Sequence, residues 1–212
     1  MQKDEVLEIL NRRYSCRDFD RNRKIPNEDF EVILHSGRCA PSSLGLESWK
    51  FVVITNDLLK HQIAADAPGN QDKIEDCSHL VVVCAVIGDV IKPDSNYLKK
   101  LYKDEKYFQS INSMLKSVRE NRLRNDEKMI ESYAREQCFI AIGQMTQTAA
   151  MLDIDSCIIG GFYAAGLKGL LGQYMNTDDI NPACLLSFGY SKKNTIPPKN
   201  RKPYEEAIKW IS

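Results

Sequence analysis

Runs of apolar residues mark four segments of the chain as buried strands. Residues 50–55 and 79–87 are rich in valine and isoleucine, and further apolar runs occupy residues 157–159 and 183–190. Continuous apolar runs without polar alternation are typical of strands that are covered on both faces. The sequence therefore predicts a central sheet of about four strands.

Helical periodicity fills the segments between these strands. The clearest pattern spans residues 131–152, where Phe139, Ile142, Met145 and Ala149 recur at three- and four-residue steps, as expected for a helix in a core or a subunit interface. Further helices are predicted around residues 6–10, over 27–34 with Asn27 as N-cap, over 58–67 and over 167–175. Because helical length dominates, a three-layer α+β sandwich is favoured over a doubly wound parallel sheet.

The chain shows no repeat or linker, so residues 1–212 are predicted to form one domain. Residues 94–130 are charged and contain several tyrosines, which predicts a helical excursion packed over the main body. Residues 195–212 begin with a proline-rich basic stretch, which predicts an extended C-terminal tail.

Charge and composition exclude several classes of protein. The 212 residues carry 29 lysines and arginines against 29 aspartates and glutamates, so no overall field favours nucleic acid or an anionic membrane. A basic cluster at residues 116–124 leaves two interpretations open, a solvated helix face and a nucleic-acid patch. No apolar run approaches the roughly 20 residues that span a bilayer, and no secretory signal is visible.

Familiar catalytic motifs do not occur. The three histidines lie far apart without metal-ligand spacing, so no metal site is expected. The chain contains neither a G-x-G-x-x-G fingerprint nor a G-x-S-x-G elbow, so a Rossmann dinucleotide domain and a serine hydrolase are not supported. Seven widely spaced cysteines are typical of free thiols in a reducing cytoplasm.

Positive charge gathers directly after the first predicted helix. Arg13, Ser15 and Arg17 alternate with Tyr14 and Cys16. Guanidinium groups and hydroxyls are good phosphate ligands, so this segment is a candidate anion site. The alternative is that these charges only complement the dipole of the preceding helix.

Four separated segments together resemble the FMN-dependent nitroreductase family, and in particular its oxygen-insensitive NAD(P)H nitroreductases, including the metronidazole-activating branch. The resemblance extends from about residue 7 to residue 211. It rests on Arg13-Tyr14-Ser15-Cys16-Arg17-Asp18-Phe19, Ala40-Pro41-Ser42-Ser43, Trp49 at the start of a strand, and Lys199-Asn200-Arg201. The similarity to the metronidazole-activating branch rests on Leu152 to Phe162 and on Glu136-Gln137-Cys138. The resemblance implies a three-layer α/β/α sandwich with a mostly antiparallel sheet in an intertwined homodimer, with the tail embracing the partner subunit.

The resemblance also assigns cofactor-binding roles. It implies that Arg13, Ser15, Lys199 and Arg201 hold the FMN phosphate and ribityl chain, with Tyr14 beside them. Residues placed near the flavin ring are Arg17, Asn70, Lys73, Ile159, Gly160 and Gly161, with Cys157 either facing the flavin or packing in its strand. A loop with Pro41, Ser42, Ser43 and Gly45 would reach the flavin of the other subunit.

Two positions depart from the family pattern. Many members carry a glutamate where this chain has Gly160, so the carboxylate is missing although the backbone N–H remains. Many members also carry an asparagine at the position of Gly45, so that side-chain contact is missing as well.

The function implied by the resemblance is two-electron reduction of nitroaromatic or nitroheterocyclic compounds, or of quinones. NADPH or NADH would be the reductant in a ping-pong cycle, in the cytoplasm, without a side-chain acid or base. Alternatives are another reductase of the same fold, acting on halogenated compounds, pteridines or flavins, and a flavin-binding protein without turnover.

Overall fold

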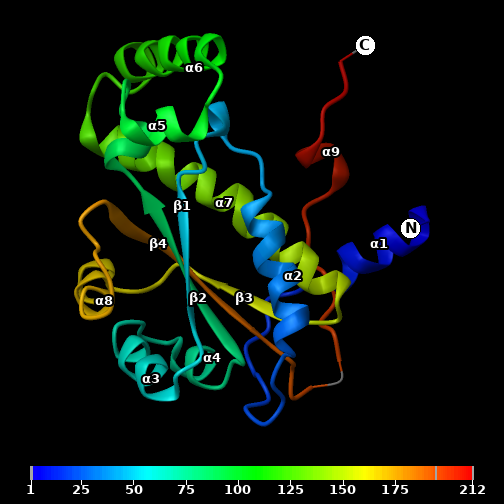
Figure 1. Cartoon of the computed structure of the whole chain (residues 1–212). Helices are drawn as coiled ribbons and strands as arrows, with labels where there is room; N and C mark the ends of the chain where they lie inside the picture. Colours follow the sequence, from blue (N-terminus) through cyan, green and yellow to red (C-terminus); the bar gives the residue numbers. More distant parts are fainter. Residues whose placement is uncertain (1, 194, 212) are drawn as a thin grey trace.

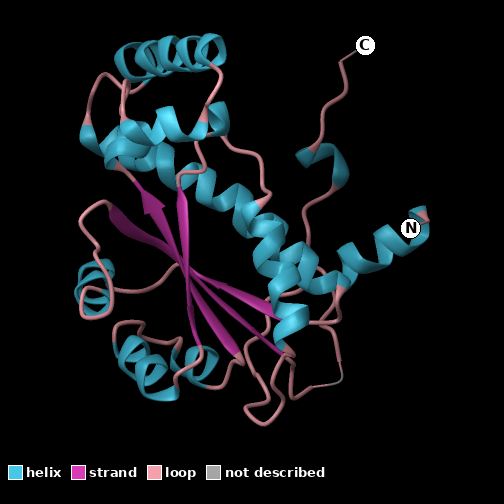
Figure 2. Cartoon of the chain, in the orientation of Figure 1, coloured by secondary structure: helices cyan, strands magenta, loops and turns pink. Residues whose placement is uncertain are grey.

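A central sheet of four strands organises the computed structural model, which describes residues 2–193 and 195–211 (Figure 1). The strands are β1 (Trp49–Ile54), β2 (His79–Val86), β3 (Asp155–Ile159) and β4 (Ile180–Gly189). They lie in the order β1-β2-β4-β3, and each neighbouring pair is antiparallel. Figure 2 shows the strands together at the centre, with helices to both sides of them. The predicted α+β class with a small antiparallel sheet is confirmed.

Helices cover both faces of the sheet. Because side chains alternate along a strand, Val81 and Val83 of β2 enter one core, whereas Leu80 and Val82 enter a second. The first core is closed by α2 (Asn27–Arg38) and α7 (Glu127–Met151), and the second by α3 (Asp57–Ala65), α4 (Gln71–Glu75) and α8 (Ala164–Leu171). The predicted three-layer sandwich is therefore confirmed.

Short polar side chains cap the starts of four helices in the described part of the chain, namely α3, α5 (Asn96–Leu101), α6 (Glu105–Ser117) and α7. Asp126 caps α7 by accepting a hydrogen bond from the Met129 N–H at 2.9 Å, and Asn56 does the same for α3. The prediction that Asn27 caps α2 is wrong, because α2 begins at Asn27 itself and Pro26 occupies the capping position. Proline fixes a φ compatible with helix entry, so the chain turns into the helix directly after it.

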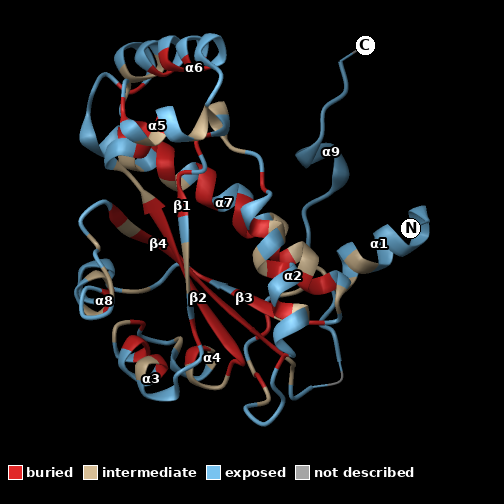
Figure 3. Ribbon diagram, viewed as in Figure 1, coloured by how far each residue is buried: buried red, intermediate tan, exposed pale blue. Residues whose placement is uncertain are grey.

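Two predictions of burial are wrong in part. Residues 50–55 were expected to form a strand covered on both faces, but β1 is an edge strand in which only Trp49 and Ile54 are buried. Figure 3 shows that α7 carries both buried and exposed stretches along its length. Ile142, Met145 and Ala149 are buried as predicted, whereas Phe139 is 47% exposed. Periodicity does not separate a side chain in the core from one on an uncovered apolar face.

The excursion after β2 contains η2 (Gly88–Ile91), α5 (Asn96–Leu101), α6 (Glu105–Ser117) and the π-helical turn η3 (Val118–Arg122). Its residues Leu98, Phe108 and Leu115 extend the first core beside the start of α7 (Figure 1). The short helix η1 (Ser43–Gly45) lies next to it.

The chain begins with α1 (Lys3–Arg12), and the C-terminal tail is extended apart from α9 (Tyr204–Ala207). Ser212, the end of the predicted tail, is outside the described residues. Within residues 2–193 and 195–211, no helix is both long and apolar enough to cross a membrane.

His79, at the start of β2, is expected to make folding stability depend on pH. Its ring is stacked on Phe30 with centroids 4.0 Å apart, and its Nδ1 lies 3.0 Å from Ser78 Oγ. Burial lowers the pKa of His79 to about 4, and the positive charges of Lys60 and Lys24 add to the effect. Because the unfolded imidazole titrates near 6.5, the unfolded chain binds this proton first as the pH falls.

The free energy of unfolding should therefore lose up to about 3 kcal/mol between pH 6.5 and pH 4 through this group, with the full contribution present above pH 6.5. Urea denaturation at both pH values, at one protein concentration, measures the loss. His79→Phe keeps the stacked ring but cannot titrate, so its stability should fall less. Equal losses in the two proteins would contradict the assignment.

Candidate active site

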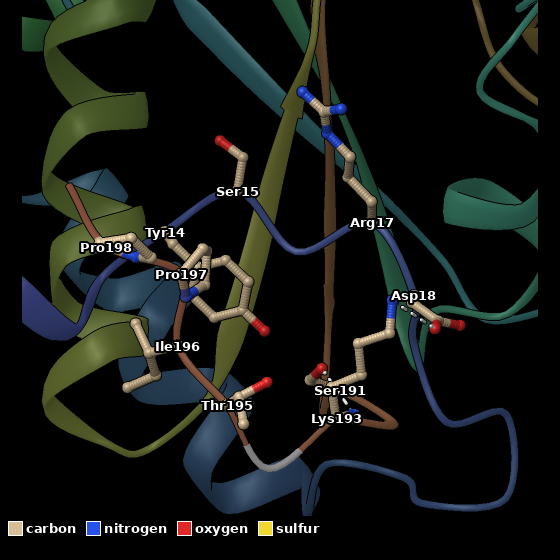
Figure 4. Close-up of a pocket in the computed structure, with 10 residues that line it drawn as sticks. All are labelled: Tyr14, Ser15, Arg17, Asp18, Ser191, Lys193, Thr195, Ile196, Pro197 and Pro198. Atoms are coloured by element: carbon tan, nitrogen blue, oxygen red, sulfur yellow. Dashed lines mark hydrogen bonds and ion pairs between the residues drawn. The ribbon is translucent and has the colours of Figure 1, made fainter. Parts of the chain in front are cut away.

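The segment after α1 is extended and runs along the sheet. Ser15 forms an isolated parallel bridge with Ser156, and the Cys16 N–H donates to the Ser156 carbonyl at 2.9 Å. Side chains of an extended segment alternate, so Ser15 and Arg17 project to one side and Tyr14 to the other (Figure 4). Ser15 and Arg17 therefore share one face, whereas Tyr14, which was also predicted beside the cofactor, lies on the other.

The two ends of the chain meet at this segment. The Lys199 ammonium donates a hydrogen bond to the Arg13 carbonyl, 186 residues away in sequence. A cavity of about 220 Å³ is lined by Arg13, Ser15, Lys199 and Arg201, among others. The structure thus brings together the four residues that were predicted to grip a phosphate.

Positive charge in this cavity has no carboxylate partner among residues 2–193 and 195–211. The pKa of Lys199 lies below its ordinary value, first through desolvation and then through the charges of Arg13 and Arg201. In the described part of the chain, none of Arg13, Lys199 and Arg201 forms an ion pair with a carboxylate. Several converging cations with a hydroxyl are suited to a dianionic phosphate.

A second group of predicted residues meets where α4 approaches the end of β3. The Asn70 amide donates to the Gly161 carbonyl at 3.1 Å, and Lys73 Nζ donates to Asn70 Oδ1 at 2.8 Å. A Cβ built on Gly160 would meet no atom within 4 Å, so the backbone of Gly160 faces open space. Glycine at this position leaves room for a flat ligand to approach the main chain.

Cys157 lies on β3, where its thiol is influenced by charges from both groups. Burial raises the pKa of its thiol, and the nearby positive charges of Lys73 and Arg17 oppose that rise. The side chain is 6% exposed and packs in the second core with Cys16 and Ile159, which favours the packing role over direct contact with a ligand. Ile159, at the end of β3, is 2% exposed as a whole residue and is paired with Leu185 of β4, so within the single chain it offers little surface to a ligand.

The loop with Pro41, Ser42, Ser43 and Gly45 is not joined to these groups within one chain. The Ser43 N–H donates to Gln137 Oε1 at 2.8 Å, and the loop lies against the excursion rather than against the 13–17 segment (Figure 1). Within the single chain, these predicted site residues therefore lie apart from the other two groups.

Sequence reasoning missed part of the surroundings of the 13–17 segment. A cavity of about 590 Å³ lies between this segment and residues that follow β4 (Figure 4). Beside Tyr14, Ser15 and Arg17 it is lined by Asp18, Ser191, Lys193, Thr195, Ile196, Pro197 and Pro198. The pKa of Tyr14 is raised to about 12, chiefly by burial, so its phenol is a neutral lining group. No motif marks Ser191 or Lys193, because their position depends only on where β4 ends.

Comparison with known proteins decides the family. The model of the nitroreductase family matches residues 10–190. This chain belongs to the nitroreductase family. An oxygen-insensitive NADPH nitroreductase of Helicobacter acinonychis (strain Sheeba) is 37% identical over 211 residues, covering 100% of this chain and 99% of the relative.

Solved nitroreductase-like structures share the fold. A nitroreductase family protein from Streptococcus pneumoniae TIGR4 superimposes with a TM-score of 0.81 at 20% identity, over 97% of this chain and 99% of that one. A protein of Exiguobacterium sibiricum, solved in complex with FMN, gives a TM-score of 0.77 at 23% identity over 100% and 98% of the two chains. At these identities the likeness establishes the architecture around the site.

Proposed function

We propose that this nitroreductase binds FMN without a covalent bond and uses NADPH or NADH to reduce nitroaromatic or nitroheterocyclic compounds, or quinones. The observation that carries the proposal is the cation cluster made by both ends of the chain, which has no carboxylate partner among the described residues. The open space at Gly160 adds to it. The names of the relatives and the FMN in the Exiguobacterium sibiricum protein support it. When bound, FMN supplies a two-electron carrier that takes a hydride from NAD(P)H and passes it to the acceptor.

The donor set of the cation cluster fits the phosphate end of FMN. Arg13 and Arg201 offer planar guanidinium forks, Lys199 offers an ammonium, and Ser15 offers a hydroxyl. Since the cations repel one another in the free protein, a dianion lowers the energy of the whole group. The same charges would therefore determine both the affinity for FMN and the orientation of its phosphate end.

The second group fits the polar edge of the ring. Lys73 fixes the orientation of the Asn70 amide, whose remaining hydrogen-bonding capacity can face a ligand. The positive charges of Arg17 and Lys73 favour negative charge at that edge, which eases reduction. Gly160 and Gly161 carry no side chains that would keep a ligand from their backbone N–H groups, and Gly160 faces open space. No side-chain acid or base is required, so the protein orients the reactants and excludes water.

Two copies of the chain would complete each site. We place Pro41, Ser42, Ser43 and Gly45 at the flavin of the partner subunit, with the tail wrapped around that partner. Exposed apolar side chains support a homodimer, since Phe139 and Ile140 on α7 and Trp210 and Ile211 in the tail are 43% to 91% exposed. The excursion would cover the acceptor side of the flavin, and the cytoplasm would supply the reduced nicotinamide.

Anaerobic reduction of the purified protein tests this function. The protein should be yellow, its visible flavin absorption should bleach on addition of NADPH or NADH, and a nitrofuran, metronidazole or a quinone should restore it. A protein that retains FMN but does not bleach is a flavin-binding protein without turnover. A colourless protein that does not take up added FMN contradicts the proposal.

A further inference from the structure

The loop between α2 and β1 holds an unfavourable backbone shape. Leu44, Gly45 and Glu47 have positive φ values of 55°, 62° and 50°. Glycine adopts this region freely, but leucine and glutamate do so at a cost, because their Cβ atoms crowd the backbone. Such a shape persists only where the surroundings hold it in place.

Tyrosines of the excursion supply part of that hold. The Tyr97 hydroxyl, at the start of α5, donates to the Leu46 carbonyl at 2.8 Å. The Tyr102 hydroxyl, just after α5, donates to the Leu44 carbonyl. Both acceptor carbonyls belong to the strained loop, so the excursion is hydrogen-bonded to residues 42–47 on one side.

The helix α7 holds the same loop from the other side. Its Tyr133 donates a hydrogen bond to Ser43 Oγ, and its Gln137 accepts one from the Ser43 N–H at 2.8 Å. Gln137 in turn donates to the Tyr133 carbonyl at 3.1 Å, which fixes its amide. The loop is thus held between a long core helix and the excursion.

Tyr102 also explains the absence of a side chain at position 45. A Cβ built on Gly45 would lie 3.0 Å from the Tyr102 hydroxyl, so a larger residue would displace that hydroxyl from the Leu44 carbonyl. Burial, followed by the neighbouring Tyr107, Tyr97 and Glu47, raises the pKa of Tyr102 to about 12. Its hydroxyl therefore remains a donor at neutral pH.

We propose that Tyr97 and Tyr102 are positioning residues that hold the 42–47 loop in its left-handed shape and tie it to the excursion. The inference rests on the proposed function, in which this loop forms part of the partner's flavin site. The loop and the excursion then act as one unit on the acceptor side. A displaced excursion removes two hydrogen bonds that maintain the loop.

Tyr97→Phe, Tyr102→Phe and the double variant test this role, because phenylalanine keeps the ring and removes only the donor. The N–H groups of Ser43, Gly45, Leu46 and Glu47 are hydrogen-bonded, so their exchange with deuterium reports on the loop. We expect exchange in residues 43–47 to rise about fivefold for each lost bond and more in the double variant. The KM for a nitro acceptor should rise by a similar factor, with FMN content and kcat retained.

Tyr107→Phe is the matched control. Tyr107 lies in α6 and touches the Tyr102 ring edge-on at 5.3 Å, yet it is 55% exposed and forms no hydrogen bond with the described part of the loop. It should leave both exchange and KM unchanged.

If deuterium exchange in residues 43–47 is unchanged in the double variant, Tyr97 and Tyr102 do not hold the loop. Raised exchange with an unchanged acceptor KM would overturn its link to the acceptor side. A failure of the proposed function is seen separately, in the lack of flavin bleaching in the unmodified protein, and deuterium exchange does not depend on turnover.

Discussion

Replacing Arg13 and Arg201 with alanine in one chain is expected to remove bound FMN and leave the protein folded. The two guanidiniums come from opposite ends of the chain and line the same cavity. A hydrogen bond to a charged partner contributes about 1.5 to 3 kcal/mol, so the loss of both groups should weaken FMN binding by roughly 100-fold to 10,000-fold. Each single variant should show about the square root of that factor if the two contributions are independent.

The stability of the flavin-free protein distinguishes a ligand cluster from a structural one. The cations repel one another, as the lowered pKa of Lys199 indicates, and they have no carboxylate partner among the described residues. Removing two of them should leave the unfolding midpoint of the apoprotein unchanged or raise it. A structural ion cluster would lose stability instead.

Fluorescence titration of apoprotein with FMN measures the affinity, and thermal unfolding without FMN measures the stability. Lys3→Ala combined with Lys202→Ala changes the net charge by the same amount at exposed positions on the same two terminal segments. This control should bind FMN with nearly unchanged affinity. If the Arg13 and Arg201 double variant retains its full flavin content, the phosphate site lies elsewhere.

An apolar run in the sequence predicted a buried strand correctly where helices cover both faces of that strand. β2 reads as a continuous apolar run because both of its faces are covered by helices. β1 has a similar composition but lies at the edge of the sheet, and its Val53 is partly exposed. An apolar run therefore shows that a segment is hydrophobic, but it does not show that the segment is buried within a single chain. The apolar residues of α7 carry the same ambiguity, since Phe139 belongs to the pattern but not to the core.

Sequence motifs predicted part of the candidate site, namely the residues that belong to a recognisable family pattern. Arg13, Ser15, Lys199 and Arg201 could be grouped by resemblance to a family, and the structure brings them to one cavity. Contacts that depend on distance rather than motif were out of reach. The hydrogen bonds from Tyr97 and Tyr102 to the 42–47 loop join residues more than 50 positions apart, and an isolated tyrosine gives no sign of its acceptor.

The sequence analysis also overlooked Lys60. Replacing Lys60 is expected to lower the free energy of unfolding. Its side chain is fully buried in α3, although lysines with this sequence context usually lie in solvent. The ammonium lies 2.7 Å from Asp57 Oδ1 and donates to the carbonyls of Cys77 at 3.0 Å and Glu75 at 3.3 Å. All three of its N–H donors therefore have acceptors.

Lys60→Ala should lower the free energy of unfolding by about 4 kcal/mol, and Lys60→Met by about 2 kcal/mol. Methionine keeps the apolar stem but leaves the Cys77 and Glu75 carbonyls without their donor, whereas alanine also leaves a cavity. Urea denaturation at pH 7 measures both losses. Lys100→Met, at an exposed helical position on α5, should stay within about 0.5 kcal/mol of the unmodified protein.

The two carbonyls make Lys60 a link between α3 and the flavin side of the molecule. Glu75 is the last residue of α4, Asn70 directly precedes this helix, and Lys73 lies within it. A shift of α4 therefore moves Asn70, which contacts Gly161, together with Lys73, which contacts Asn70. Lys60→Met should therefore weaken FMN binding by a few fold beyond its effect on stability. It should also raise the pKa of His79, since the Lys60 charge holds it down, although burial keeps it below the ordinary value. An NMR titration of His79 measures that shift. A variant with unchanged stability and an unchanged His79 pKa would show that the ammonium does not hold this junction.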